Sequence, residues 1–189
     1  MDMLYQPAEN LASRYHFSKV PNYIAPSVLK VDYDLLVSQG VRHIVFDVDN
    51  TLVSFNERRL DPQICNFIVN LQESSRFATI RLATNSPRRL KWLRDTLGLH
   101  ISQPRPWRFK PLPSFYEHIL ADIRDQSGSV CMIGDKLIQD IWGANAVGMT
   151  SVLVQPLGRD NWIDRCLLFR QHERRLLRKY LPHHVEKWF

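Results

Sequence analysis

The stretch that decides the fold is Ile44-Val45-Phe46-Asp47-Val48-Asp49-Asn50-Thr51-Leu52-Val53. Its first half is a short β-branched and aromatic run, which predicts a strand buried on both faces of a parallel sheet. In open α/β sheets, ligands bind beyond the carboxyl ends of such strands. Asp47 and Asp49 therefore occupy the position at which this kind of sheet binds its ligand.

The two carboxylates at this strand end repel each other. At a separation of about 4 Å and an effective dielectric constant of roughly 20, the repulsion is about 4 kcal/mol. Asp47 and Asp49 therefore need a bound cation, or a proton on one of them. The alternative interpretation is that Asp49, Asn50 or Thr51 only caps a helix or a turn, as these residue types often do.

Composition is typical of a globular protein with one core, because 44% of the 189 residues are hydrophobic. The net charge of +6 favours a polyanionic partner: an anionic lipid surface, nucleic acid or a multiply charged small substrate. Cys65, Cys131 and Cys166 are widely spaced, so we expect neither a disulfide framework nor a zinc site. No stretch resembles a signal peptide or a membrane span. We expect a cytoplasmic protein, either free or peripheral on the inner face of the membrane.

Strand and helix patterns alternate along the chain. Helices are predicted at 28–39, 62–72, 87–97, 114–124 and 138–147, and strands at 41–47, 77–83, 99–101, 130–133 and 150–154. The alternation predicts right-handed βαβ crossovers and a three-layer α/β/α, Rossmann-like fold around a mainly parallel sheet. We expect an N-terminal arm (1–20), one α/β core (21–157) and a basic helical tail (158–189).

Residues 162–180 combine apolar residues at helical spacing with Arg165, Arg170, Arg174, Arg175, Arg178 and Lys179. This pattern predicts a basic amphipathic helix or helix pair. In one interpretation it lies on an anionic bilayer, where each basic residue contributes about 1 kcal/mol. In the other, its apolar face packs on the domain and its charges face solvent.

Further polar residues follow predicted strands or open predicted helices: Thr84 and Asn85, then Lys110, then Gly134-Asp135 with Asp140. Each has an ordinary explanation alone, such as a helix cap, a solvated lysine or a turn. Together with Asp47 and Asp49, their order and spacing resemble the four motifs of the haloacid dehalogenase (HAD) superfamily, whose first motif is Asp-x-Asp-x-Thr.

Chemistry suggests a role for each residue. A phosphate monoester needs a nucleophile, a proton donor and positive charge on its non-bridging oxygens. Asp47 is the candidate nucleophile, forming an aspartyl-phosphate, and Asp49 is the candidate acid that protonates the leaving alcohol and later activates water. Mg²⁺ suits such a site, and its predicted ligands are Asp47, the backbone carbonyl of Asp49, and Asp135.

The remaining residues are expected to hold the phosphate. Thr84 and the adjacent helix-start amides would hydrogen-bond a phosphoryl oxygen, and Asn85 would support the same oxygens. Lys110 would place its charge on the phosphoryl group and on Asp47. Asp140 would orient Lys110 or a metal-bound water. The resemblance implies the same roles, and it favours a phosphatase because HAD dehalogenases lack an aspartate at the position of Asp49.

The chain also resembles one capless branch of HAD subfamily IIIA, the YqeG-type proteins related to mitochondrial and plastid phosphatidylglycerophosphate phosphatases. The similarity covers about residues 20–180 and is carried by 47–53, Lys110-Pro111, 134–145 and 152–157. It implies a core with no large cap domain and the conversion of phosphatidylglycerophosphate to phosphatidylglycerol. The departures, Ser86, Lys136 and the loop Trp107-Arg108-Phe109, bear on the substrate.

Two other functions remain open from the sequence. A soluble HAD phosphatase would act on nucleotides, sugar phosphates or nucleic acid ends. A basic interaction protein would contact the ribosome or nucleic acid through the C-terminal arginines.

Overall fold

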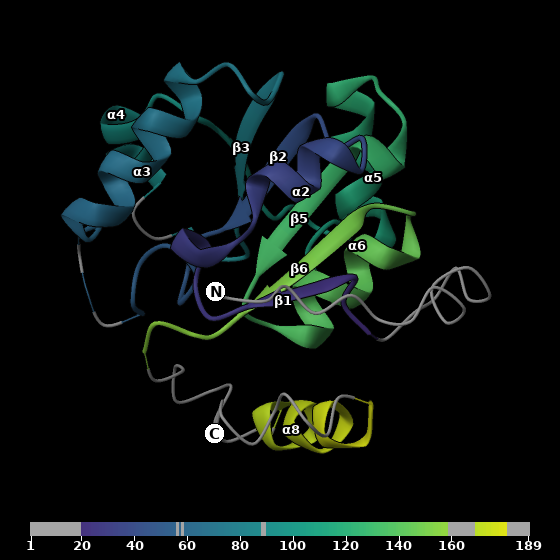
Figure 1. Cartoon of the computed structure of the whole chain (residues 1–189). Helices are drawn as coiled ribbons and strands as arrows, with labels where there is room; N and C mark the ends of the chain where they lie inside the picture. The colour runs from purple at the N-terminus through teal and green to yellow at the C-terminus, as the bar shows by residue number, and fades with distance from the viewer. Residues whose placement is uncertain (1–19, 56, 58, 88–89, 159–168, 181–189) are drawn as a thin grey trace.

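The computed structural model describes residues 20–55, 57, 59–87, 90–158 and 169–180. Six parallel strands form one sheet in the order β1-β6-β5-β2-β3-β4 (Figure 1). They are β1 (Tyr23–Ala25), β2 (His43–Asp47), β3 (Thr79–Ala83), β4 (His100–Ser102), β5 (Val130–Gly134) and β6 (Thr150–Val154). Because all six run the same way, their carboxyl ends lie along one edge of the sheet.

Helices cover both faces of the sheet (Figure 1). The side chains of Ile44 and Phe46 share a core cluster with α2 (Tyr33–Ser38), α3 (Pro62–Glu73) and α4 (Leu90–Leu97). Val45, between them on β2, points to the other face and packs with α5 (Pro113–Ile123) and α6 (Gly143–Ala146). This alternation confirms the predicted three-layer α/β/α, Rossmann-like fold.

Local sequence explains where the main elements begin and end. All five residues of β2 are buried, as expected for a central parallel strand. Helix α3 begins with Pro62, and the Asp61 carboxylate accepts a hydrogen bond from the Gln63 N–H. Residues 48–61 connect β2 to α3, so the described chain has no large cap domain inserted after the first motif.

Three elements differ from the prediction. The helix expected at 28–39 is two pieces, a 3₁₀ turn η1 (Val28–Lys30) and α2, because Asp32 caps the second piece by accepting the Leu35 N–H. The short strand β1 was not predicted. The helix expected at 138–147 begins as a π-helical turn, η3 (Leu137–Trp142), and continues as α6.

The basic tail is described only over helix α8 (Phe169–Tyr180); the N-terminal arm to residue 19, and residues 159–168 and 181–189, lie outside the described residues. Leu177 is buried in a cluster with Ile24, Leu137 and Leu153. Arg175, Arg178 and Lys179 are exposed. The structure therefore packs part of the apolar face of α8 on the domain. Among the described residues, no helix is long and apolar enough to cross a membrane.

Candidate active site

The loop after β2 turns back sharply at the carboxyl edge of the sheet. The N–H groups of Leu52 and Val53 both donate to the Val48 carbonyl, at 3.0 Å each, and the Asn50 N–H donates to the Val53 carbonyl at 2.7 Å. Asn50 has a φ of +64°, a conformation that asparagine tolerates better than most residues. This turn leaves Asp47 buried and Asp49 half-buried, with Asp49 closer to solvent.

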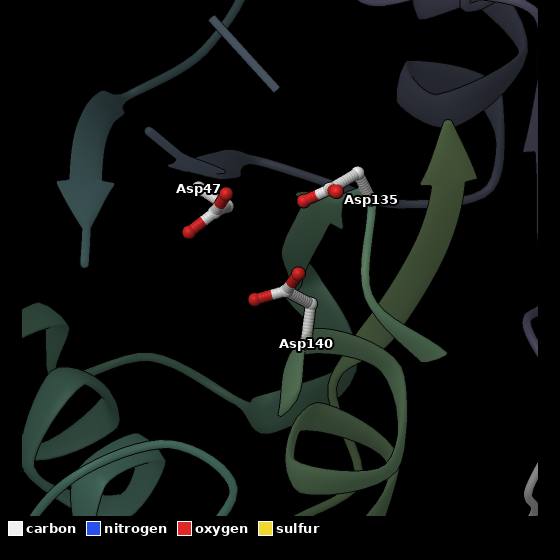
Figure 2. A group of neighbouring side chains, drawn as sticks. All are labelled: Asp47, Asp135 and Asp140. Carbon is white, nitrogen blue, oxygen red and sulfur yellow. The ribbon is translucent and has the colours of Figure 1, made fainter. Parts of the chain in front are cut away.

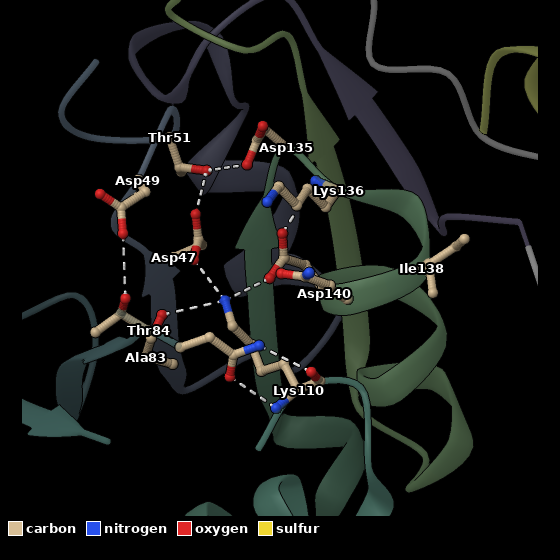
Figure 3. Close-up of polar contacts among 12 residues, drawn as sticks. Asp47, Asp49, Thr51, Ala83, Thr84, Lys110, Asp135, Lys136, Ile138 and Asp140 are labelled. Carbon is tan, nitrogen blue, oxygen red and sulfur yellow. Dashed lines mark hydrogen bonds and ion pairs between the residues drawn. The ribbon is translucent and has the colours of Figure 1, made fainter. Parts of the chain in front are cut away.

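Lys110 lies at the centre of the polar contacts (Figure 3). Its side chain is buried, and its ammonium contacts the carboxylates of Asp47 and Asp140, the latter at 2.6 Å. It also donates to the Ala83 carbonyl at 3.3 Å. The structure therefore unites residues that are 63 and 30 positions away from Lys110 in the sequence.

The electrostatics of this cluster follow from its burial. Burial raises the pKa of Asp47 to about 8, against the opposing influence of the Lys110 ammonium, and the nearby carboxylates of Asp140 and Asp135 add to the rise. Burial alone would lower the pKa of Lys110, but the carboxylates of Asp140 and Asp47 outweigh it and raise that pKa. The ammonium therefore stays charged, and the cluster favours a proton or a cation on Asp47.

Three carboxylates form a group that could hold a cation: Asp47, Asp135 and Asp140 each offer an oxygen, and these oxygens lie within 4.8 Å of one another (Figure 2). The Thr51 hydroxyl lies 3.0 Å from Asp47 Oδ2 and 3.2 Å from Asp135 Oδ1. A hydroxyl has one hydrogen, so it can donate to only one of these two oxygens at a time. Carboxylate oxygens facing each other in this way fit a hard divalent cation such as Mg²⁺.

The carboxylates of Asp140 and Asp49 make other contacts than Asp47 Oδ2 and Asp135 Oδ1, the two oxygens beside the Thr51 hydroxyl. Asp140 uses one oxygen for Lys110 and the other for the Lys136 N–H at 3.0 Å. The Asp49 carboxylate is directed toward the Thr84 hydroxyl, at 3.4 Å (Figure 3). The predicted side-chain ligands Asp47 and Asp135 thus face each other, while the Asp49 carboxylate lies apart, as expected if only its backbone carbonyl contributes.

Thr84 and Asn85, which are predicted to bind phosphoryl oxygens, follow β3 and make contacts within the protein. The Thr84 hydroxyl accepts the Ser86 N–H at 2.9 Å. The Asn85 side chain donates to the Lys110 carbonyl at 2.8 Å and accepts the Lys110 N–H at 2.9 Å. Asn85 therefore positions Lys110 in the structure. Helix α4 begins at Leu90 and residues 88–89 lie outside the described residues, so the predicted helix-start amides beside Thr84 are not among the groups described.

The loop after β5 is shaped by a glycine. A Cβ at Gly134 would overlap the Asp140 side chain, so no larger residue fits between β5 and this carboxylate. Asp135 follows directly, and the π-helical turn η3 then places Asp140 beside Lys110. The Tyr116 hydroxyl of α5 donates to the Gln139 carbonyl and so ties this turn to α5.

Glu173 contacts the start of η3, and the sequence did not indicate this role. It lies on α8 among basic residues, yet it is only 4% exposed, and its carboxylate accepts the Ile138 N–H at 2.9 Å. This contact ties the C-terminal helix to the start of η3. A glutamate in a basic helix is normally a solvent-exposed partner for its neighbours, and nothing in its spacing distinguishes it from one.

The polar residues border an open cleft of ≈ 290 Å³ at the carboxyl edge of the sheet. Asp47, Thr84 and Lys110 are the buried charged or hydroxyl-bearing residues that line it, and Asp49 and Lys136 are half-buried. The full lining is Asp47, Asp49, Asn50, Phe55, Thr84, Asn85, Ser86, Pro87, Lys110, Lys136 and Gln139. A phosphate-sized group in this space would meet the Asp47 carboxylate, the Lys110 ammonium and the hydroxyl groups of Thr84 and Ser86.

Comparisons with known proteins point the same way. Residues 108–156 match the model of a family described as HAD-hydrolase-like. The chain is 28% identical over 160 residues to a Bacillus subtilis protein named probable phosphatase YqeG, covering 84% of this chain and 89% of that protein.

Two solved structures are similar at lower identity. An uncharacterized protein from Listeria monocytogenes serotype 4b has 15% identity, a TM-score of 0.49 and coverage of 69% of this chain and 99% of its own. A HAD phosphatase from Thermococcus onnurineus has 21% identity, a TM-score of 0.42 and coverage of 55% and 50%. The chain is therefore similar to HAD-like hydrolases over residues 108–156, and to a protein named probable phosphatase over most of its length.

Proposed function

We propose that this protein is a Mg²⁺-dependent phosphatase that hydrolyses a phosphate monoester through an aspartyl-phosphate on Asp47. The observation that carries the proposal is the convergence of Asp47, Lys110, Asp135 and Asp140 in one buried cluster, of which Asp47 and Lys110 line an open cleft. Burial of carboxylates and of an ammonium is unfavourable in free energy unless the charges are paired or serve a function. Side chains with perturbed pKa values concentrate at catalytic sites.

The cation would be held by Asp47, Asp135 and the backbone carbonyl of Asp49. When bound, Mg²⁺ supplies positive charge that lets an anionic nucleophile approach an anionic phosphoryl group. Asp47 Oδ2 faces Asp135 across the Thr51 hydroxyl, which leaves Oδ1, on the Lys110 side, to attack phosphorus. Lys110 then balances charge on the non-bridging oxygens, and Asp140 keeps the ammonium in place.

Asp49 lies where it can act as the general acid in the first step and as the general base in the second. The Asp49 carboxyl group lies nearer to solvent than the Asp47 carboxyl group. It accepts a hydrogen bond from the hydroxyl of Thr84, which also lines the cleft. As the bond from phosphorus to the alcohol breaks, Asp49 gives its proton to the leaving oxygen. Asp49 next takes a proton from water, whose oxygen attacks phosphorus while the bond to Asp47 breaks. The products are the alcohol and inorganic phosphate, with Asp47 and Asp49 returned to their starting states.

For the substrate, we propose phosphatidylglycerophosphate, with phosphatidylglycerol as product. The resemblance to the YqeG-type branch supports this choice. The openness of the cleft and the exposed Arg175, Arg178 and Lys179 on α8 are consistent with a substrate anchored in an anionic surface. A head group presented from a bilayer needs a site that no cap domain encloses.

The test is phosphate release by the full chain from phosphatidylglycerophosphate in detergent micelles, with Mg²⁺. A panel of nucleotides and sugar phosphates is measured alongside. We expect the lipid to be the best substrate and Asp47→Asn to lose at least about a thousandfold in rate. Asp95→Asn, which changes an exposed aspartate on α4, is the matched control and should keep full activity. Preference for a soluble ester would refute the substrate, and an active Asp47→Asn would refute the mechanism.

A further inference from the structure

The segment that precedes Lys110 presents two aromatic side chains to solvent. Trp107 is 86% exposed and Phe109 is 43% exposed, and Trp107 is the most exposed large hydrophobic residue in the described part of the chain. An exposed aromatic pair on a soluble domain marks a contact with another apolar phase more often than an accident of packing. The mechanism proposed above gives these two residues no task.

The segment is a defined turn. The Arg105 N–H donates to the Arg108 carbonyl at 2.8 Å, and the Arg108 N–H donates back to the Arg105 carbonyl at 2.9 Å. The Ser114 hydroxyl donates to the Trp107 carbonyl at 3.0 Å. Trp107 itself has a φ of +63°, which is rare for a bulky residue. Local bonds therefore hold the backbone of Trp107 in a conformation that tryptophan does not favour, with its side chain exposed.

Positive charge flanks the two aromatics. Arg105 is exposed and Arg108 is half-buried. No acidic side chain among the described residues forms an ion pair with either arginine. The segment thus combines two exposed aromatic rings with two arginine side chains, and guanidinium groups bind phosphate oxygens well.

The turn is attached to the candidate active site. It leaves the carboxyl end of β4 and leads into Lys110, so it lies at the sheet edge that carries the cleft. Lys110 is three positions after Trp107, which places their Cα atoms within about 11 Å of each other at most. The two hydrogen bonds between Asn85 and the Lys110 backbone fix the end of the turn to the cleft wall. A surface bound by the turn would lie beside the cleft.

We propose that residues 105–109 form a membrane-interface anchor. Trp107 and Phe109 insert among the head groups of an anionic phospholipid bilayer, and Arg105 and Arg108 bind lipid phosphates. Tryptophan prefers the bilayer interface because its ring is apolar and its N–H is polar. The exposed rings and the adjacent guanidinium groups together favour an anionic bilayer, which offers both an apolar phase and phosphate groups. This inference deepens the proposed function, since it explains how the open cleft meets a lipid-bound phosphate.

The first test is co-sedimentation of the full chain with vesicles of phosphatidylcholine alone or with 30 mol% phosphatidylglycerol. We expect binding to the anionic vesicles to fall at least about fivefold in Trp107→Ala and about fivefold in each of Arg105→Gln and Arg108→Gln, since about 1 kcal/mol per arginine corresponds to that factor. Brominated lipid should quench wild-type tryptophan fluorescence and quench Trp107→Ala much less. Val37→Ala removes an exposed apolar side chain on α2 and should bind as the wild type does.

The second test compares two rates. The rate on phosphatidylglycerophosphate in vesicles is divided by the rate on soluble p-nitrophenyl phosphate, which reports whether the cleft itself is intact. We expect this ratio to fall at least fivefold in Trp107→Ala and to recover in Trp107→Phe. An unchanged ratio with unchanged vesicle binding would overturn the anchor while leaving the phosphatase in place. Tryptophan-dependent vesicle binding by a protein inactive on the lipid would instead support the anchor and refute the substrate.

Discussion

Removal of the Lys110 charge should be one of the most destabilising single changes in the described part of the protein. Lys110 is 2% exposed, and its ammonium contacts two carboxylates, one of them at 2.6 Å. Lys110→Met keeps the aliphatic length and deletes the charge, so the carboxylates of Asp47, Asp135 and Asp140 are left together in a buried space. Removing one partner of a buried ion pair costs about 3–5 kcal/mol. At this chain length that lowers the melting temperature by roughly 6–20 °C.

The assay is thermal unfolding followed by circular dichroism, without metal, at pH 6.0 and pH 8.5. The loss should be larger at pH 8.5, because at pH 6.0 a proton on Asp47, whose pKa is raised to about 8, replaces part of the missing positive charge. Arg76→Met is the matched control: its ion pair with Asp34 has a distance of 2.8 Å but is solvent-exposed, so it should cost at most about 1 kcal/mol. Equal small losses in the two variants would refute the view that Lys110 holds the cluster together.

Three further predictions follow from the same contacts. Burial raises the metal-free pKa of Asp47 to about 8, so the folded state binds a proton that the unfolded state releases. Stability without metal should therefore fall as pH rises from about 4 to 8. The Mg²⁺ affinity, measured by calorimetry, should rise about tenfold per pH unit up to that pKa. Glu173→Ala frees the Ile138 N–H, and we expect a loss of about 1–3 kcal/mol by denaturant unfolding, with a raised KM for Mg²⁺; normal stability would contradict this. Gly134→Ala forces the Asp140 side chain away, which should reduce kcat at least about a hundredfold in a steady-state assay while the fold persists.

The sequence predicted the fold because the strand signals were strong and the topology followed from them. The apolar run before Asp47 and the short runs before Thr84 and Asp135 are strands that a parallel sheet must bury. Once the strands are parallel, their carboxyl ends share an edge. The meeting of Asp47, Lys110 and Asp135 therefore follows from topology.

The elements that the sequence did not predict depend on contacts between distant segments. β1 has three residues between two prolines, too few for a periodic pattern, and only its pairing with β6 makes it a strand. The Asn85 side chain binds the Lys110 backbone 25 residues away. Glu173 is buried because α8 packs against η3, and a helical sequence pattern does not specify which element a helix packs against. Each of these features is a tertiary contact with no local signature.

The central claim is that Asp47 carries the phosphoryl group during turnover. The most direct measurement is rapid acid quench of the full chain with ³²P-labelled phosphatidylglycerophosphate, followed by peptide mass spectrometry. The account predicts a label on the peptide that contains Asp47, acquired before phosphate release and absent in Asp47→Asn. Turnover without a labelled peptide, or a label on a different residue, would contradict it.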